Sequence, residues 1–218
     1  MPYLTIKDYE SEREAISDCL SELTKLHRRF EEHIDLKDKD RKHALYLLVG
    51  VAISSAHAAF DQYSKGFIVG VHQLARFVLE VHSLAEYFLV IPDEGSGEIE
   101  KWFRGEHVET RYKNQTKKKI EKMIDKKARI PFKTLPKHEL LKREKVIQDN
   151  FKTLSYFSHP TIYSTKQPQA CDFARLILIP VADISVDAQR MYFLPEDSLP
   201  GLMFSEFRLL FENFRTHD

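Results

Sequence analysis

The stretch RKHALYLLVGVAISSAHAAFDQYSKGFIVGVHQLARFVLEVHSLAEYFLVI, residues 41–91, decides the fold. Its first half, Arg41 to Tyr63, is apolar nearly all round, which is typical of a helix in the middle of a bundle. The second half, Gly66 to Ile91, predicts another long helix, which Pro92 and the following DEGSG end. Apolar side chains recur in this second helix at spacings of three and four, and they form its expected core face: Phe67, Val71, Leu74, Val78, Val81, Ala85 and Phe88.

The most apolar part of this stretch has the composition of a core helix. The 17 residues from Ala44 to Phe60 include no Asp, Glu, Lys or Arg. That length lies at the short limit for a membrane span, and the stretch contains Ser54, Ser55 and His57. We therefore expect a buried helix here and no contact with a membrane.

Further helices are expected on both sides. Ser11 and Glu14 form an S-x-x-E capping box, which predicts the start of a helix that runs to Ile34. The alternating charges of residues 35–42 indicate a turn. Later helices are expected over residues 98–105, 107–129, 136–159 and 198–214.

The C-terminal quarter changes character. Residues 173–179 and 191–194 are apolar and rich in β-formers, so we predict a β-hairpin over about 172–195. Pro180 and Pro195 would lie at strand ends, where a missing donor does little harm. The whole sequence thus predicts one mainly α domain, residues 1–218, a bundle of five to seven helices with a small C-terminal β-hairpin.

Composition excludes several classes of protein. The 218 residues are 43% hydrophobic and 30% charged, which excludes a disordered chain. The two cysteines, Cys19 and Cys171, give no disulfide framework, and residues 1–14 lack the apolar region of a signal peptide. We therefore expect a cytoplasmic protein.

Charge is unevenly spread, although the net charge is zero. Residues 101–152 hold 17 Lys and Arg against 7 Asp and Glu. A basic stripe is the usual electrostatic footprint for phosphate backbones, so contact with RNA or another phosphate-bearing ligand is one interpretation. The other is a solvated helix with ion pairs at i,i+4. The predicted nucleic-acid-binding residues are Lys117, Lys118, Lys119, Lys122 and Lys126.

A polar line runs along the helix expected over 66–91. His72, Arg76 and Glu80 follow one another at steps of four residues, and Ser83 and Tyr87 extend the line. Either these side chains form a polar pocket inside the bundle, or Arg76 and Glu80 are a structural pair that bridges to a neighbouring helix.

The segment LSYFSHP, residues 154–160, ends another expected helix, because Pro160 disfavours helix at the residue before it. Ser155 and His159 share one face of the last turn, where the helix dipole favours a protonated imidazole. His159 is therefore either a general acid/base near neutral pH or a helix cap.

Motifs for other chemistries are missing from the sequence. It contains no G-x-x-x-x-G-K or G-x-G-x-x-G loop, and its ten histidines show no metal-ligand spacing, so we expect neither cofactor nor metal. The C-terminal segment carries more aromatic residues than one core needs, which predicts a homodimer. These residues are Phe204, Phe207, Phe211 and Phe214.

The R-x-x-x-E pattern of Arg76 and Glu80, followed by Trp102 and the L-S-x-x-x-H-P turn, resembles a group of uncharacterised bacterial helical proteins. More distantly, the pattern is similar to the HEPN superfamily of helical bundles. Active HEPN proteins are metal-independent ribonucleases of toxin–antitoxin and phage-defence systems, with an Arg-x(4–6)-His motif at a dimer interface. In this chain Lys152 stands at the six-residue spacing before His159.

An Arg-x4-His spacing does occur in the first expected helix, at Arg28 and His33. The resemblance implies that His159 is the acid/base and that Lys152 or Arg76 binds phosphate, with Glu80 as a further catalytic candidate. The alternative is a non-enzymatic helical interaction or scaffold protein, in which the polar line is structural.

Overall fold

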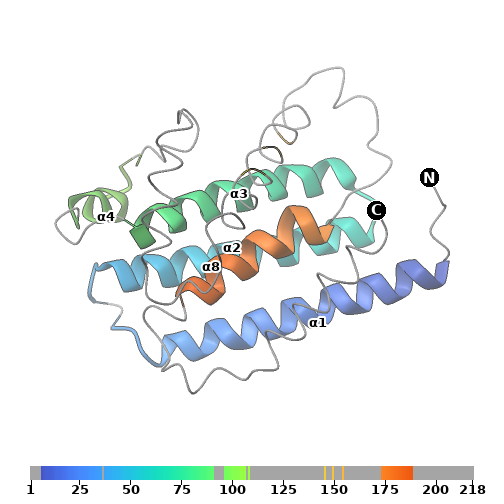
Figure 1. Cartoon of the computed structure of the whole chain (residues 1–218), viewed down its shortest axis with the longest axis horizontal. Helices are drawn as coiled ribbons and strands as arrows, with labels where there is room; N and C mark the ends of the chain where they lie inside the picture. The colour runs from blue at the N-terminus through green and yellow to red at the C-terminus, as the bar shows by residue number, and fades with distance from the viewer. Residues whose placement is uncertain are drawn as a thin grey trace.

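The computed structural model describes residues 6–35, 37–90, 96–106 and 173–188, together with residues 108, 145, 149 and 154 (Figure 1). Within these ranges the chain is helical and contains no strand, so the predicted mainly α class is confirmed. The elements are α1 (Ile6–Glu31), α2 (Arg41–Ser64), α3 (Ile68–Val90), α4 (Ser96–Phe103), the π-helical turn η3 (Ala174–Leu178) and α8 (Ile179–Ala188).

Helix α1 packs on α2 through the apolar face that its sequence predicts. The capping-box prediction is wrong, because α1 already includes Ile6 and Ser11 therefore lies inside the helix rather than at its start. The turn predicted after α1 is confirmed, and it ends at Asp40, whose carboxylate accepts a hydrogen bond from the His43 backbone N–H at 2.8 Å. The buried residues described on α1 are Ile16, Cys19, Leu20, Leu23, Leu26 and Phe30.

Helix α2 is the centre of the described bundle, because α1, α3, α4 and α8 all pack against it (Figure 1). It turns into α3 at Gly66, whose φ of 77° a side chain would disfavour. By length and composition α2 is also the one described helix that would suffice to cross a membrane, and half of its most apolar stretch is buried in the bundle.

Helix α3 confirms most of its expected core face. Val71, Val78, Val81 and Ala85 are buried, and Phe88 meets the ring of Trp102 on α4 edge to face at 5.8 Å. Phe67 is an exception, because it precedes the helix and lies exposed in the turn after α2.

The predicted C-terminal hairpin is wrong in its first strand, because residues 173–188 are helical. Nearly every side chain described there is buried, and a short apolar run has the same sequence signature in a buried helix as in a strand. Pro180 lies in the first turn of α8 and cannot donate to a carbonyl four residues back. The π-helical turn η3 ends directly before α8, so the helical hydrogen-bond pattern is irregular at the point where Pro180 lacks a donor.

Several predictions fall on residues outside the described ranges. These are the second strand over 191–194, the helix over 198–214 with its proposed dimer contact, and the helix over 107–129 apart from Val108, which is not helical. Of the helix predicted over 136–159, the structure describes Lys145, Asp149 and Leu154, and all three are helical.

Candidate functional site

Helix α3 carries an unusual set of polar side chains into the core. His82 is 1% exposed and Glu86 is 0% exposed. The two residues are four positions apart, so they lie on the same face of the helix, one turn above the other. Burying an imidazole and a carboxylate costs free energy unless both find polar or charged partners. The identity of those partners therefore decides what this part of α3 does.

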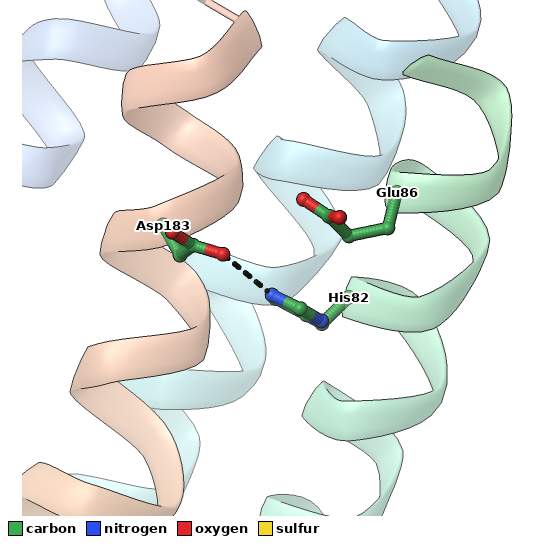
Figure 2. A group of neighbouring side chains, drawn as sticks. All are labelled: His82, Glu86 and Asp183. Carbon is green, nitrogen blue, oxygen red and sulfur yellow. Dashed lines mark hydrogen bonds and ion pairs between the residues drawn. The ribbon is translucent and has the colours of Figure 1, made fainter. Parts of the chain in front are cut away.

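Helix α8 supplies one partner. Asp183 points from α8 toward His82, and the distance between His82 Nε2 and Asp183 Oδ2 is 3.0 Å (Figure 2). The Asp183 side chain is 16% exposed, so this contact is shielded from most of the solvent. It joins two residues that are 101 positions apart in the sequence.

The three side chains form one compact group. His82 and Glu86 from α3 and Asp183 from α8 point into the space between the two helices (Figure 2). One donor atom from each residue lies within 4.8 Å of the others. Ligand atoms around a metal ion are separated by about 3–4 Å when each bond is about 2.0–2.2 Å long. The group therefore requires only a small contraction to hold an ion.

Residues of the predicted polar line along α3 make contacts within that helix. Arg76 Nε and Glu80 Oε1 pair with each other along the helix at 3.4 Å. Ser83 donates its hydroxyl to the Leu79 carbonyl at 2.8 Å. His72 is buried, and this burial lowers its pKa.

Most of the other predicted site residues lie in parts of the chain that the structure does not describe. His159 and Lys152 lie outside the residues that the structure describes. The same is true of the predicted nucleic-acid-binding residues Lys117, Lys118, Lys119, Lys122 and Lys126. Arg28 and His33, the pair with Arg-x4-His spacing, are exposed near the end of α1.

The sequence did contain half of the signal for the buried group. A His-x-x-x-Glu spacing on a helix places both ligands on one face, and His82 and Glu86 have that spacing. This spacing differs from the Glu-x-x-His and His-Glu-x-x-His motifs of common helical metal sites. Asp183 could not be found in this way, because its segment was predicted to connect two strands.

Comparison of the chain with protein-family models, with curated proteins and with solved structures gave no match.

Proposed function

We propose that this protein binds a divalent transition-metal ion between α3 and α8, with His82, Glu86 and Asp183 as ligands. The observation that carries the proposal is the convergence of one donor atom from each residue within 4.8 Å at a buried position. Two carboxylates balance the charge of a divalent cation, and a neutral imidazole adds none. Such an ion would make the buried group electrically neutral.

The donor set favours some metals over others. Ca²⁺ and Mg²⁺ prefer oxygen ligands alone, whereas imidazole suits Zn²⁺, Fe²⁺ and related ions. No cysteine belongs to the group, so the soft thiolate chemistry that selects Cu⁺ is missing from it. Mn²⁺, Fe²⁺, Co²⁺ and Zn²⁺ are the ions that this set of ligands suits.

The position of the group supports a structural or sensory role for the ion. None of the three side chains is more than 16% exposed, which leaves little access for a large substrate. The ligands come from two helices far apart in the sequence, so an ion would link α8 to the α2–α3 hairpin. Loading would then stabilise the folded chain by mass action.

Metal titration of the full chain tests the proposal. After removal of bound metal with a chelator, calorimetric titration with Mn²⁺, Co²⁺ or Zn²⁺ should show one ion per chain. At a free metal concentration of 100 times Kd, the free energy of unfolding should rise by about 2.7 kcal/mol. Cobalt adds an independent readout, because its visible absorption changes when a nitrogen ligand binds.

Matched variants separate a specific site from adventitious binding. His82→Ala, Glu86→Gln and Asp183→Asn should each weaken binding by more than about 100-fold, since even changes to residues behind the ligands cost about 10- to 100-fold. His72→Gln changes another buried histidine of α3 and should retain wild-type affinity. Absence of binding to the wild type, or equal losses in His72→Gln, would show that His82 and Asp183 form only a structural pair.

Contact with RNA through residues 101–152 is a second candidate function. The excess of 17 basic over 7 acidic residues in this segment supports it. Lysine contacts phosphates and reads no bases, so binding should be sequence-independent, with a salt slope of about −0.7 per contacted phosphate on single strands. Replacing Lys117, Lys118 and Lys119 by Gln should reduce that slope. No retardation of RNA by wild-type protein at about 50 mM salt would exclude this function.

A further inference from the structure

Helices α3 and α8 run in the same direction along the bundle. The ring of Phe173, just before η3, contacts Tyr63 and Phe60 near the end of α2, at 5.4 and 6.0 Å between ring centroids. Because α2 turns directly into α3, this contact places the start of the η3–α8 segment beside the start of α3 (Figure 1). Further along both helices, His82 meets Asp183.

The parallel run of the two helices places another potential ligand, Asp187, one turn beyond Asp183 on α8. Asp187 follows Asp183 by four residues, so both lie on the face of α8 that contacts His82. Glu86 follows His82 by the same interval on α3. Parallel helices that match at His82 and Asp183 also match one turn later, and Glu86 and Asp187 therefore lie at one level. Asp187 is 8% exposed.

We propose that Asp187 is a further ligand of this metal site, and that it tunes the site toward Mn²⁺ and Fe²⁺; the inference rests on the proposed function. The carboxylate of Asp187 is not among the donor atoms within 4.8 Å of one another. It would join them by a side-chain rotation when the ion enters. The loaded site then has one imidazole nitrogen and three carboxylates, His82 and Glu86 from one helix and Asp183 and Asp187 from the other. With a divalent ion it carries one net negative charge, so the ligand bond from Asp187 is offset in part by a desolvation cost that the neutral three-ligand site does not have.

The chemistry of this set explains the expected preference. Carboxylate oxygens suit Mn²⁺ and other hard ions, and ions of this kind accept more than four ligands. Zinc is satisfied by four ligands in a tetrahedral arrangement, which the other three residues and one water can supply. Intrinsic affinity still favours Zn²⁺ over Mn²⁺ at a given site. Asp187 should therefore reduce the difference in affinity between Zn²⁺ and Mn²⁺, and Zn²⁺ should still bind more tightly.

The test compares two metals in two variants of the full chain. Asp187→Asn keeps the shape of the side chain and removes its charge, and it should weaken Mn²⁺ binding about tenfold while changing Zn²⁺ binding much less. Ser185→Ala is the matched control, since Ser185 is buried on α8 and donates only to the Val181 carbonyl of its own helix. That variant should leave both affinities unchanged.

A structure of the Mn²⁺-loaded wild type gives an answer that does not depend on how a variant folds. Anomalous scattering should locate the ion with an Asp187 oxygen at an ordinary bonding distance of about 2–2.6 Å. An Asp187 carboxylate that stays out of contact, or wild-type Mn²⁺ affinity in Asp187→Asn, would overturn this inference and leave the three-ligand site standing. If His82→Ala and Asp183→Asn both keep wild-type metal affinity, the proposed function itself is overturned.

Discussion

Two of the histidines that lie between helices of this bundle, His27 and His82, have completely different surroundings. His27 of α1 stacks on the Tyr46 ring of α2, with ring centroids 4.4 Å apart, and its Nε2 lies 3.0 Å from the Tyr46 carbonyl oxygen. His82 of α3 lies 3.0 Å from the Asp183 carboxylate, with Glu86 beside it. The same side chain thus meets an aromatic ring and a backbone carbonyl in one place, and two carboxylates in the other.

The difference shows how neighbours determine what a buried imidazole can do. A carbonyl oxygen accepts one hydrogen bond from Nε2–H of His27, which fixes the ring in place. Desolvation lowers the pKa of His27, although this hydrogen bond and the nearby Glu31 oppose the shift. Carboxylates instead bring negative charge, which a cation can balance. His27 therefore serves packing, whereas His82 is in a position to bind an ion.

The comparison predicts very different costs for the two histidines in metal-free protein. His82→Ala removes the donor to Asp183 and opens a void in the core, and it should lower the free energy of unfolding by about 3 kcal/mol. His27→Ala loses one ring contact and one hydrogen bond, and it should cost about 1–2 kcal/mol. Urea unfolding in the presence of a chelator measures both. Equal costs would mean that the carboxylates give His82 no special role.

The two contacts also differ in how far the sequence predicts them. The apolar faces of α1 and α3 recur at helical spacing, so these helices and most of their buried residues follow from the pattern alone. Residues 173–179 are apolar without a clear period, and such a run fits a strand as well as a buried helix. Asp183 faces His82 only because this segment is a helix, and the sequence alone does not distinguish that helix from a strand.

A buried site built from two helices requires knowledge of which helices meet. His82 and Glu86 share a helical face that the sequence specifies. Their approach to Asp183 arises from packing between segments 101 residues apart, and no local pattern encodes it. The sequence therefore contained the α3 half of the site, and only the folded chain supplies the α8 half.

The His27 contact depends on a glycine. A Cβ added at Gly50 would lie 2.8 Å from His27 Nε2 and 2.9 Å from Cε1, so Gly50→Ala should force the imidazole out of its stack on Tyr46. We expect a loss of about 1–2 kcal/mol in the free energy of unfolding, the usual cost of overpacking. Gly97→Ala in α4 is the matched control, because nothing lies within 4 Å of a Cβ there. Equal behaviour of both variants would show that the stack is not tightly packed.

Acid should weaken the His27 contact. Because burial lowers the pKa of His27, the unfolded chain binds more protons than the folded chain below about pH 6.5. Stability should therefore fall as the pH drops through this value, and it should level off below the folded-state pKa. The pKa of His72 is lowered in the same direction, so both residues contribute to the wild-type slope.

The His27→Ala variant isolates its share of this pH dependence. Unfolding free energies measured between pH 7.5 and 5 should vary less in the variant than in the wild type. An unchanged slope would assign the whole effect to His72 and to other groups, and it would contradict the view that His27 is held neutral by burial.

The smallest effect is expected at the outer edge of the α1–α2 contact. Thr24 Oγ1 lies 2.8 Å from the Leu20 carbonyl oxygen and 2.9 Å from His57 Nε2. The hydroxyl has a single proton, which it donates to Leu20, so it must accept a hydrogen bond from Nε2–H of His57. Thr24→Val preserves the shape of the side chain and removes both interactions. Because His57 is exposed and water can replace Thr24 as its partner, the loss should be about 0.5 kcal/mol. A loss above about 1.5 kcal/mol in urea unfolding would mean that polar contacts at the surface, rather than the His27 stack, hold α1 against α2.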